Sequence, residues 1–127
     1  MQIYFLSAAI VSVVVGIVHS VLGEHLIFKK LRRLGLVPTE AAPPLQSRNI
    51  RILWATWHLA SVFGFGFAII LYAAGVGQTS LDAFTINALI FAYVGGSALV
   101  LLATKGKHPG WVGLLSVAVL VYLGSVT

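Results

Sequence analysis

The chain has no cysteine among its 127 residues. This absence excludes disulfide bonds, thiolate metal ligands and a cysteine nucleophile. Charge is also scarce, because Asp, Glu, Lys and Arg make up 9% of the residues, against roughly 25% in an average soluble domain. The local motifs with which one helix supplies two metal ligands, HExxH and ExxH, are absent as well. Any metal site must therefore be assembled from different helices.

Long apolar runs dominate what is present. Four stretches contain no Asp, Glu, Lys or Arg: Met1–Gly23, Ile52–Leu81, Ala83–Thr104 and His108–Thr127. Each has about the ~20 residues that a helix needs to cross a bilayer. The sequence therefore predicts an all-α integral membrane protein, a four-transmembrane-helix antiparallel bundle forming a single domain over 1–127. The expected helices cover approximately 3–34, 49–74, 82–104 and 109–126, with a Pro-rich loop at 35–48.

The distribution of positive charge predicts the orientation. All eight basic residues lie around the first connection or in the third, and with four spans these connections face one side. The positive-inside rule makes that side cytoplasmic and puts both termini on the non-cytoplasmic side. We expect a bacterial inner (cytoplasmic) membrane, with the basic residues attracted to anionic lipid headgroups rather than to nucleic acid. The first helix lacks a basic n-region, so we expect it to remain as a span and not to be a cleaved signal peptide.

Polar residues in the first helix fall into one stripe. At ~100° per residue, Ser12, Gly16, His19, Ser20 and Gly23 share a narrow face. Such a face should contact protein, because hydroxyl and imidazole groups need partners inside a bilayer. By the same geometry, Glu24 lies at the edge of this stripe. His25 points to the far side of the helix, near the headgroups.

The second helix repeats the pattern. Arg51, Trp54, His58 and Ser61 share a face, while Trp57 lies elsewhere. His58 and the first-helix His19 each lie ten residues from a basic anchor, which puts both imidazoles at a similar depth, ~15 Å from the interface. We therefore expect an intramembrane site near the cytoplasmic side. Its candidate metal ligands are His19, His58, Glu24, His108 and His25. The side chains expected to line the pocket or to orient these ligands are Ser20, Arg51, Trp54 and Ser61.

Histidines with a carboxylate are the ligand set of a transition metal ion such as zinc, iron or copper. Two histidines from separate helices could instead hold haem b. Iron, copper or haem would allow redox chemistry, whereas zinc would not. We also expect Glu24 to be charged and paired with Arg51, because an isolated carboxylate there would take up a proton.

Other interpretations stay open. The histidines could simply bond a serine or a carbonyl, and the tryptophans could be interface anchors. The chain could be a non-catalytic accessory or assembly subunit of a larger membrane complex. It could also be a small proton-coupled transporter that acts as a homo-oligomer, with Glu24 and the histidines as a relay. No motif assigns an enzymatic reaction.

Overall fold

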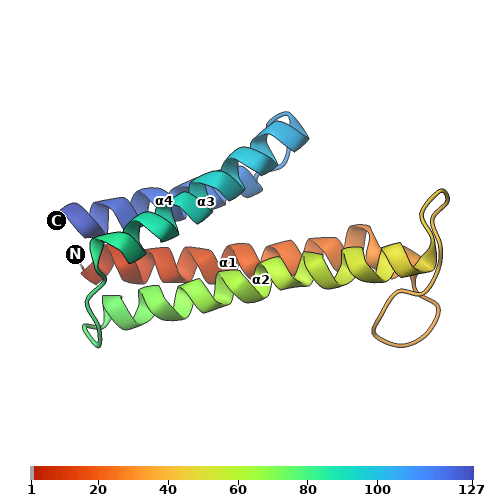
Figure 1. The fold of residues 1–127 in the computed structure, drawn as a ribbon, viewed down its shortest axis with the longest axis horizontal. Helices are drawn as coiled ribbons and strands as arrows, with labels where there is room; N and C mark the ends of the chain where they lie inside the picture. The colour runs from red at the N-terminus through yellow and green to blue at the C-terminus, as the bar shows by residue number, and fades with distance from the viewer. Residues whose placement is uncertain (1) are drawn as a thin grey trace. The chain divides into compact units, whose positions relative to one another are not determined.

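The computed structural model describes residues 2–127. They form four α-helices and one 3₁₀ turn: α1 (Gln2–Leu26), η1 (Phe28–Leu31), α2 (Ser47–Gly75), α3 (Ala83–Thr104) and α4 (Gly110–Val126) (Figure 1). The described residues form no sheet, and a single bridge pairs Ala42 with Leu45 in the loop before α2. The predicted all-helical fold is confirmed.

Three of the helices, α1, α2 and α3, are long and apolar enough to cross a membrane. Helix α4 is apolar but has 17 residues, about 26 Å at 1.5 Å per residue, a little less than a ~30 Å hydrocarbon core. Large apolar side chains on these helices are exposed, for example Phe91 at 79% and Ile69 at 70%. Such surfaces suit lipid contact, which is consistent with a membrane protein.

The predicted end of the first helix at residue 34 is wrong. Helix α1 ends at Leu26, and the chain then turns through η1. Phe28 is 2% exposed and meets the Trp57 ring edge-on at 5.9 Å between centroids. Burial of this aromatic side chain is favourable, and a straight helical extension at the interface would not provide it.

The start of α3 agrees with its sequence. Asp82 is the N-cap, and its side chain accepts a 2.6 Å hydrogen bond from the Thr85 backbone N–H. This bond favours the charged carboxylate and lowers the pKa of Asp82. The other end of α3 closes with Lys105 at φ 51° and Gly106 at φ 75°, a left-handed C-terminal turn.

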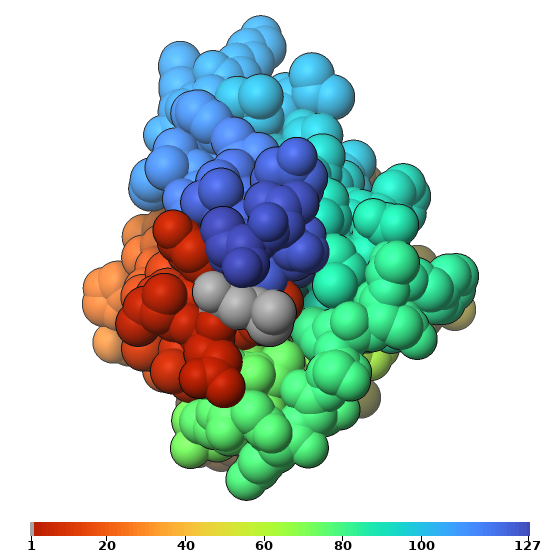
Figure 2. All heavy atoms as spheres, turned by 90° about the vertical axis from the view of Figure 1, so that its left-hand side faces the viewer, coloured from red at the N-terminus to blue at the C-terminus, as the bar shows by residue number. Residues whose placement is uncertain are grey.

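Two compact units make up the chain. One comprises the residues before Gly16 together with those after Phe63, and the other is Gly16–Phe63. In the first unit α3 and α4 lie side by side (Figure 1). Figure 2 looks onto the end of this unit, where the first turns of α1, the α2–α3 connection and the last turns of α4 gather. The prediction of a single domain stays a prediction.

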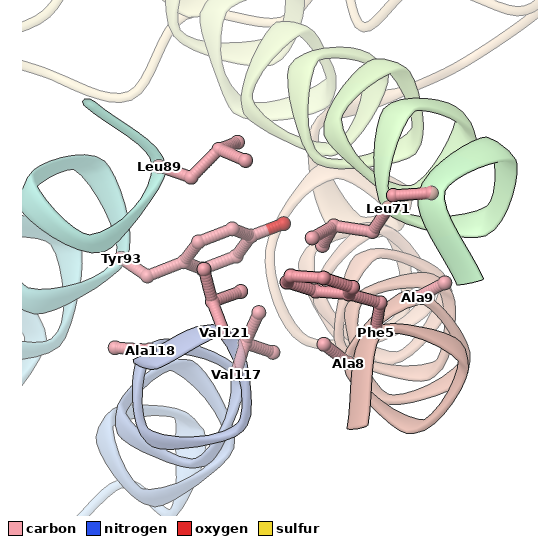
Figure 3. Close-up of a cluster of buried hydrophobic side chains, with 10 residues drawn as sticks. Phe5, Ala8, Ala9, Leu71, Leu89, Tyr93, Val117, Ala118 and Val121 are labelled. Carbon is pink, nitrogen blue, oxygen red and sulfur yellow. The ribbon is translucent and has the colours of Figure 1, made fainter. Parts of the chain in front are cut away.

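The core of the first unit takes side chains from all four helices. Phe5, Ala8 and Ala9 of α1 and Leu71 of α2 face residues of α3 and α4 (Figure 3). These partners are Leu89, Tyr93, Val117, Ala118 and Val121. The small alanines let the helices approach closely, as membrane helices do. A polar contact also links α1 to α3 within this unit, because the Tyr93 hydroxyl is hydrogen-bonded to Ser12 Oγ.

Candidate functional site

The candidate site lies in the Gly16–Phe63 unit, where the end of α1 packs against the start of α2. Ser61 Oγ donates to the Gly16 carbonyl at 3.0 Å, and Ser20 Oγ donates to Ser61 Oγ at 2.8 Å. Further along, Trp54 of α2 reaches Glu24 of α1. Residue numbers rise on one helix as they fall on the other, so these segments run antiparallel. The predicted polar stripe of α1 therefore faces α2 in this unit.

His19 forms a reciprocal pair with Trp57. The His19 Nε2 atom lies 3.1 Å from the Trp57 carbonyl oxygen, and Trp57 Nε1 donates to the His19 carbonyl at 3.0 Å. The two rings stack at 4.5 Å with 6° between their planes. The expectation that Trp57 lies away from this face is wrong. The residue in the sequence that could have indicated this contact is Gly23, because a Cβ at that position would overlap the Trp57 indole.

His58 stands at the centre of the site with both ring nitrogens engaged. Nδ1 lies 2.9 Å from Ser20 Oγ, and Nε2 lies 3.0 Å from Glu24 Oε1. The ring of Trp54 meets the imidazole edge-on at 5.1 Å. The His58 side chain is 24% exposed. Ser20, Trp54 and His58, three residues that the sequence selected, are therefore brought together around one carboxylate.

The Glu24 carboxylate has three partners. Trp54 Nε1 donates to Oε1 at 2.5 Å, and His58 Nε2 lies 3.0 Å from the same oxygen. Arg32 Nη2 donates to Oε2 at 2.7 Å. These bonds suit an ionised group, since hydrogen bonds to the charged form stabilise it. The geometry thus meets the expectation that Glu24 points toward the His58 layer.

The prediction that Glu24 pairs with Arg51 is wrong. Arg51 is exposed, and the ion pair of Glu24 is with Arg32. Sequence reasoning missed Arg32 because it extended α1 to residue 34 as a straight helix. The end of α1 at Leu26 and the η1 turn bring the guanidinium back toward the carboxylate. The only sequence signal was the run of basic residues directly after Glu24.

The Gly16 carbonyl fixes the donor and acceptor roles along the whole chain of hydrogen bonds. The Gly16 carbonyl can only accept, so Ser61 donates to it and Ser20 donates to Ser61. A hydroxyl has one proton, so Ser20 has none left, and Nδ1 of His58 must donate to it. Nε2 faces a carboxylate oxygen. One further proton must therefore lie between His58 and Glu24, on the imidazole or on the carboxyl group.

This direction bears on the chemistry of Ser20. The order hydroxyl, imidazole, carboxylate is that of a nucleophilic hydrolase, in which the imidazole accepts the serine proton. Here the Ser20 proton is directed to Ser61 and Ser20 accepts from the imidazole. The network in this form does not activate a nucleophile. It suits storage and transfer of a proton.

The two other histidines lie outside this network. His25 is exposed on α1. His108 belongs to the first unit, where its Nδ1 accepts from the Gly110 backbone N–H at 3.0 Å. Across residues 2–127, no group of three or more His, Cys, Asp or Glu side chains is placed to hold a metal ion. The metal and haem expectations for His19, Glu24 and His58 stay predictions.

No known protein family, curated protein or solved structure matches this chain. The site geometry and the helices are therefore the basis for a functional proposal.

Proposed function

We propose that this chain is an integral membrane protein in which Glu24, His58 and Ser20 form an acid–base centre for proton-coupled transport. One observation carries the proposal. The hydrogen-bond directions leave one proton between His58 Nε2 and Glu24 Oε1, which are 3.0 Å apart. Glu24 lies on α1, a helix long and apolar enough to cross a membrane. Ionisable groups at such positions are typically found in proton relays.

The proposed topology opens this centre to the cytoplasm. The positive-inside rule supports cytoplasmic connections at 35–48 and 105–109, with both termini on the other side of a bacterial inner membrane. All four helices then cross as an antiparallel bundle. Glu24 lies two residues before the end of α1, which gives its carboxylate access to protons from the basic side.

The network supports exchange of a proton as well as storage. When His58 carries the shared proton, Nε2 donates to Glu24 and Nδ1 donates to Ser20. One proton leaves the network when Nδ1 gives its proton to Ser20, Ser20 gives its own to Ser61, and Ser61 gives its own to an acceptor outside the network. The neutral imidazole then still donates from Nε2 to Glu24, while Ser20 donates to Nδ1 and Ser61 donates to Ser20. From Glu24 to Gly16 this network covers ~12 Å of helix, less than a ~30 Å core, so a complete path requires further groups, which a homo-oligomer would supply.

Proteoliposomes with an internal pH-sensitive dye test the proposal. Valinomycin lets potassium ions dissipate the membrane potential that proton entry would build up. After an external acid pulse, the lumen of vesicles with the parent protein should then acidify faster than the lumen of empty vesicles. Glu24→Gln and His58→Gln should lower this rate at least about tenfold, in the range of effects for a lost proton-transfer group. His25→Gln is the matched control, because that exposed histidine is outside the network, and it should behave as the parent.

Two results would reject this function. The first is a parent rate equal to that of empty vesicles over gradients of both signs. The second is a rate that all three variants share with the parent. Circular dichroism of each variant separates a lost function from a lost fold.

A transition metal is the second candidate. The 3.0 Å between His58 Nε2 and Glu24 Oε1 is close to the spacing of two ligands that each lie ~2.0–2.1 Å from one ion. The ion would replace the shared proton. The Arg32 guanidinium 2.7 Å from the same carboxylate disfavours a cation. Haem would require His19 to leave its stack on Trp57.

Elemental analysis and an absorption spectrum separate these candidates. Stoichiometric zinc, iron or copper that His58→Gln removes, or a Soret band that His19→Gln removes, would favour the metal or haem function. Purified protein without either, together with dye acidification that depends on Glu24, would favour the acid–base centre.

A further inference from the structure

A groove lies at the α1–η1 turn and shares Ser20 and Glu24 with the acid–base centre. It has a volume of about 440 Å³ and is lined by Ser20, Val21, Glu24, His25, Lys29 and Arg32. Sites for small molecules and headgroups start at about 300 Å³, so the groove has room for a charged group. All its lining residues belong to the Gly16–Phe63 unit.

Arg32 lines this groove, and one of its N–H donors is unused. Its Nη2 is bonded to Glu24, while its Nε is buried and has no hydrogen-bond partner among residues 2–127. A buried donor on a cation without an acceptor is unfavourable, and native proteins rarely leave one. Guanidinium groups pair through such N–H groups with the oxygens of phosphate and carboxylate. The Nε atom therefore calls for an anionic oxygen.

The charges of the groove favour the same ligand. Its lining contains two permanent cations, Lys29 and Arg32, and one carboxylate. That carboxylate, on Glu24, is already bonded to Arg32, Trp54 and His58. The positive charge that no carboxylate of the groove offsets is on the exposed Lys29 side chain, which lines the groove. An anion gains from this field and a metal cation does not.

An apolar track continues from the groove along α1. Val21, at the groove, is 58% exposed, and Ile17, one turn earlier, is 50% exposed. Residues four apart lie on the same helix face, so both side chains extend the groove in the direction away from Lys29 and His25. A charged end with an apolar track is the shape of a lipid: a headgroup at one end and an acyl chain along the helix.

We propose that this groove binds the phosphate of an anionic phospholipid. The Arg32 guanidinium and Lys29 attract the phosphate oxygens, and the acyl chain lies along Val21 and Ile17. The site does not depend on proton exchange at His58, so either proposal can fail without the other. Free phosphate offers the same oxygens, and the apolar track is the reason for choosing the lipid.

Native mass spectrometry of the full chain in detergent tests the site, with phosphatidylglycerol as the probe and phosphatidylcholine for comparison. Lys29→Gln should weaken the first phosphatidylglycerol adduct about fivefold, as expected for loss of one cation close to a headgroup. Lys30→Gln is the matched control. It removes the same charge from the neighbouring residue, which is not among the residues that line the groove. It should leave the adduct unchanged. Arg32→Lys, which removes the planar guanidinium and keeps the charge, should weaken it as well.

Three outcomes would overturn the proposal. One is an equal loss in Lys29→Gln and Lys30→Gln, which would mean general surface attraction. Another is equal retention of phosphatidylcholine and phosphatidylglycerol. The last is competition by millimolar inorganic phosphate that removes the lipid adduct completely, which would assign the groove to a free anion. Because Lys29 is exposed, its variant should fold, and the test does not depend on Arg32→Lys.

Discussion

Replacing Glu24 with glutamine measures how strongly the carboxylate holds α1, η1 and α2 together. The substitution keeps the shape and removes the charge that Arg32 and His58 contact at 2.7 and 3.0 Å. A glutamine oxygen can still accept from Trp54, but its NH₂ group then faces other donors. Hydrogen bonds to a charged group contribute about 1.5–3 kcal/mol each.

Partial exposure reduces this estimate. The side chains of Glu24, Arg32 and His58 are 31%, 20% and 24% exposed, so the site lies between a buried pair, where removing one partner costs about 3–5 kcal/mol, and a surface pair at about 0–1 kcal/mol. We expect Glu24→Gln to lower the free energy of unfolding by about 2–3 kcal/mol. The assay is reversible unfolding in mixed detergent micelles, followed by tryptophan fluorescence.

Glu40→Gln supplies the matched control. Glu40 also pairs with an arginine, Arg33, at 3.1 Å, but that arginine side chain is 80% exposed. This surface pair should contribute less than about 1 kcal/mol. If Glu24→Gln costs no more than Glu40→Gln, the reasoning that the charge of Glu24 organises the site is refuted.

Three further predictions follow from single contacts. Gly23→Ala should destabilise the protein by about 1–3 kcal/mol because the new Cβ overlaps the Trp57 indole, whereas Gly66→Ala, with nothing within 4 Å, should not; thermal unfolding of the two variants decides. Tyr93→Phe removes the buried hydroxyl bonded to Ser12 and should cost about 1 kcal/mol in the same assay, so an unchanged midpoint would contradict that bond. Asp82 has a lowered pKa in the folded state, so its stabilisation is present above its ordinary pKa of 3.8 and is lost as the pH falls through the lower folded value. An unfolding midpoint that drops as strongly in Asp82→Ala as in the parent below pH 3.8 would show that the cap is not responsible.

The sequence by itself determined the helices and the face of α1 that contacts protein. Uncharged runs longer than a bilayer crossing, and the ~3.6-residue spacing of Gly16, Ser20 and Gly23, are local properties of the chain. The same spacing selected His58 and Ser61 on α2, and the N-cap role of Asp82 required only its position before an apolar run. Burial of polar groups inside a membrane leaves few alternatives for such residues, because they need partners.

Only the tertiary structure decided which charges meet. Arg32 replaces Arg51 as the partner of Glu24 because α1 ends at Leu26 and the chain turns back. That end depends on a contact with α2, the burial of Phe28 against Trp57, which no pattern within α1 encodes. Trp57 in turn reaches His19 because Gly23 leaves room for an indole. Periodicity sets the face of a helix, but contacts between distant residues set where the helix stops and which donor reaches a carboxylate.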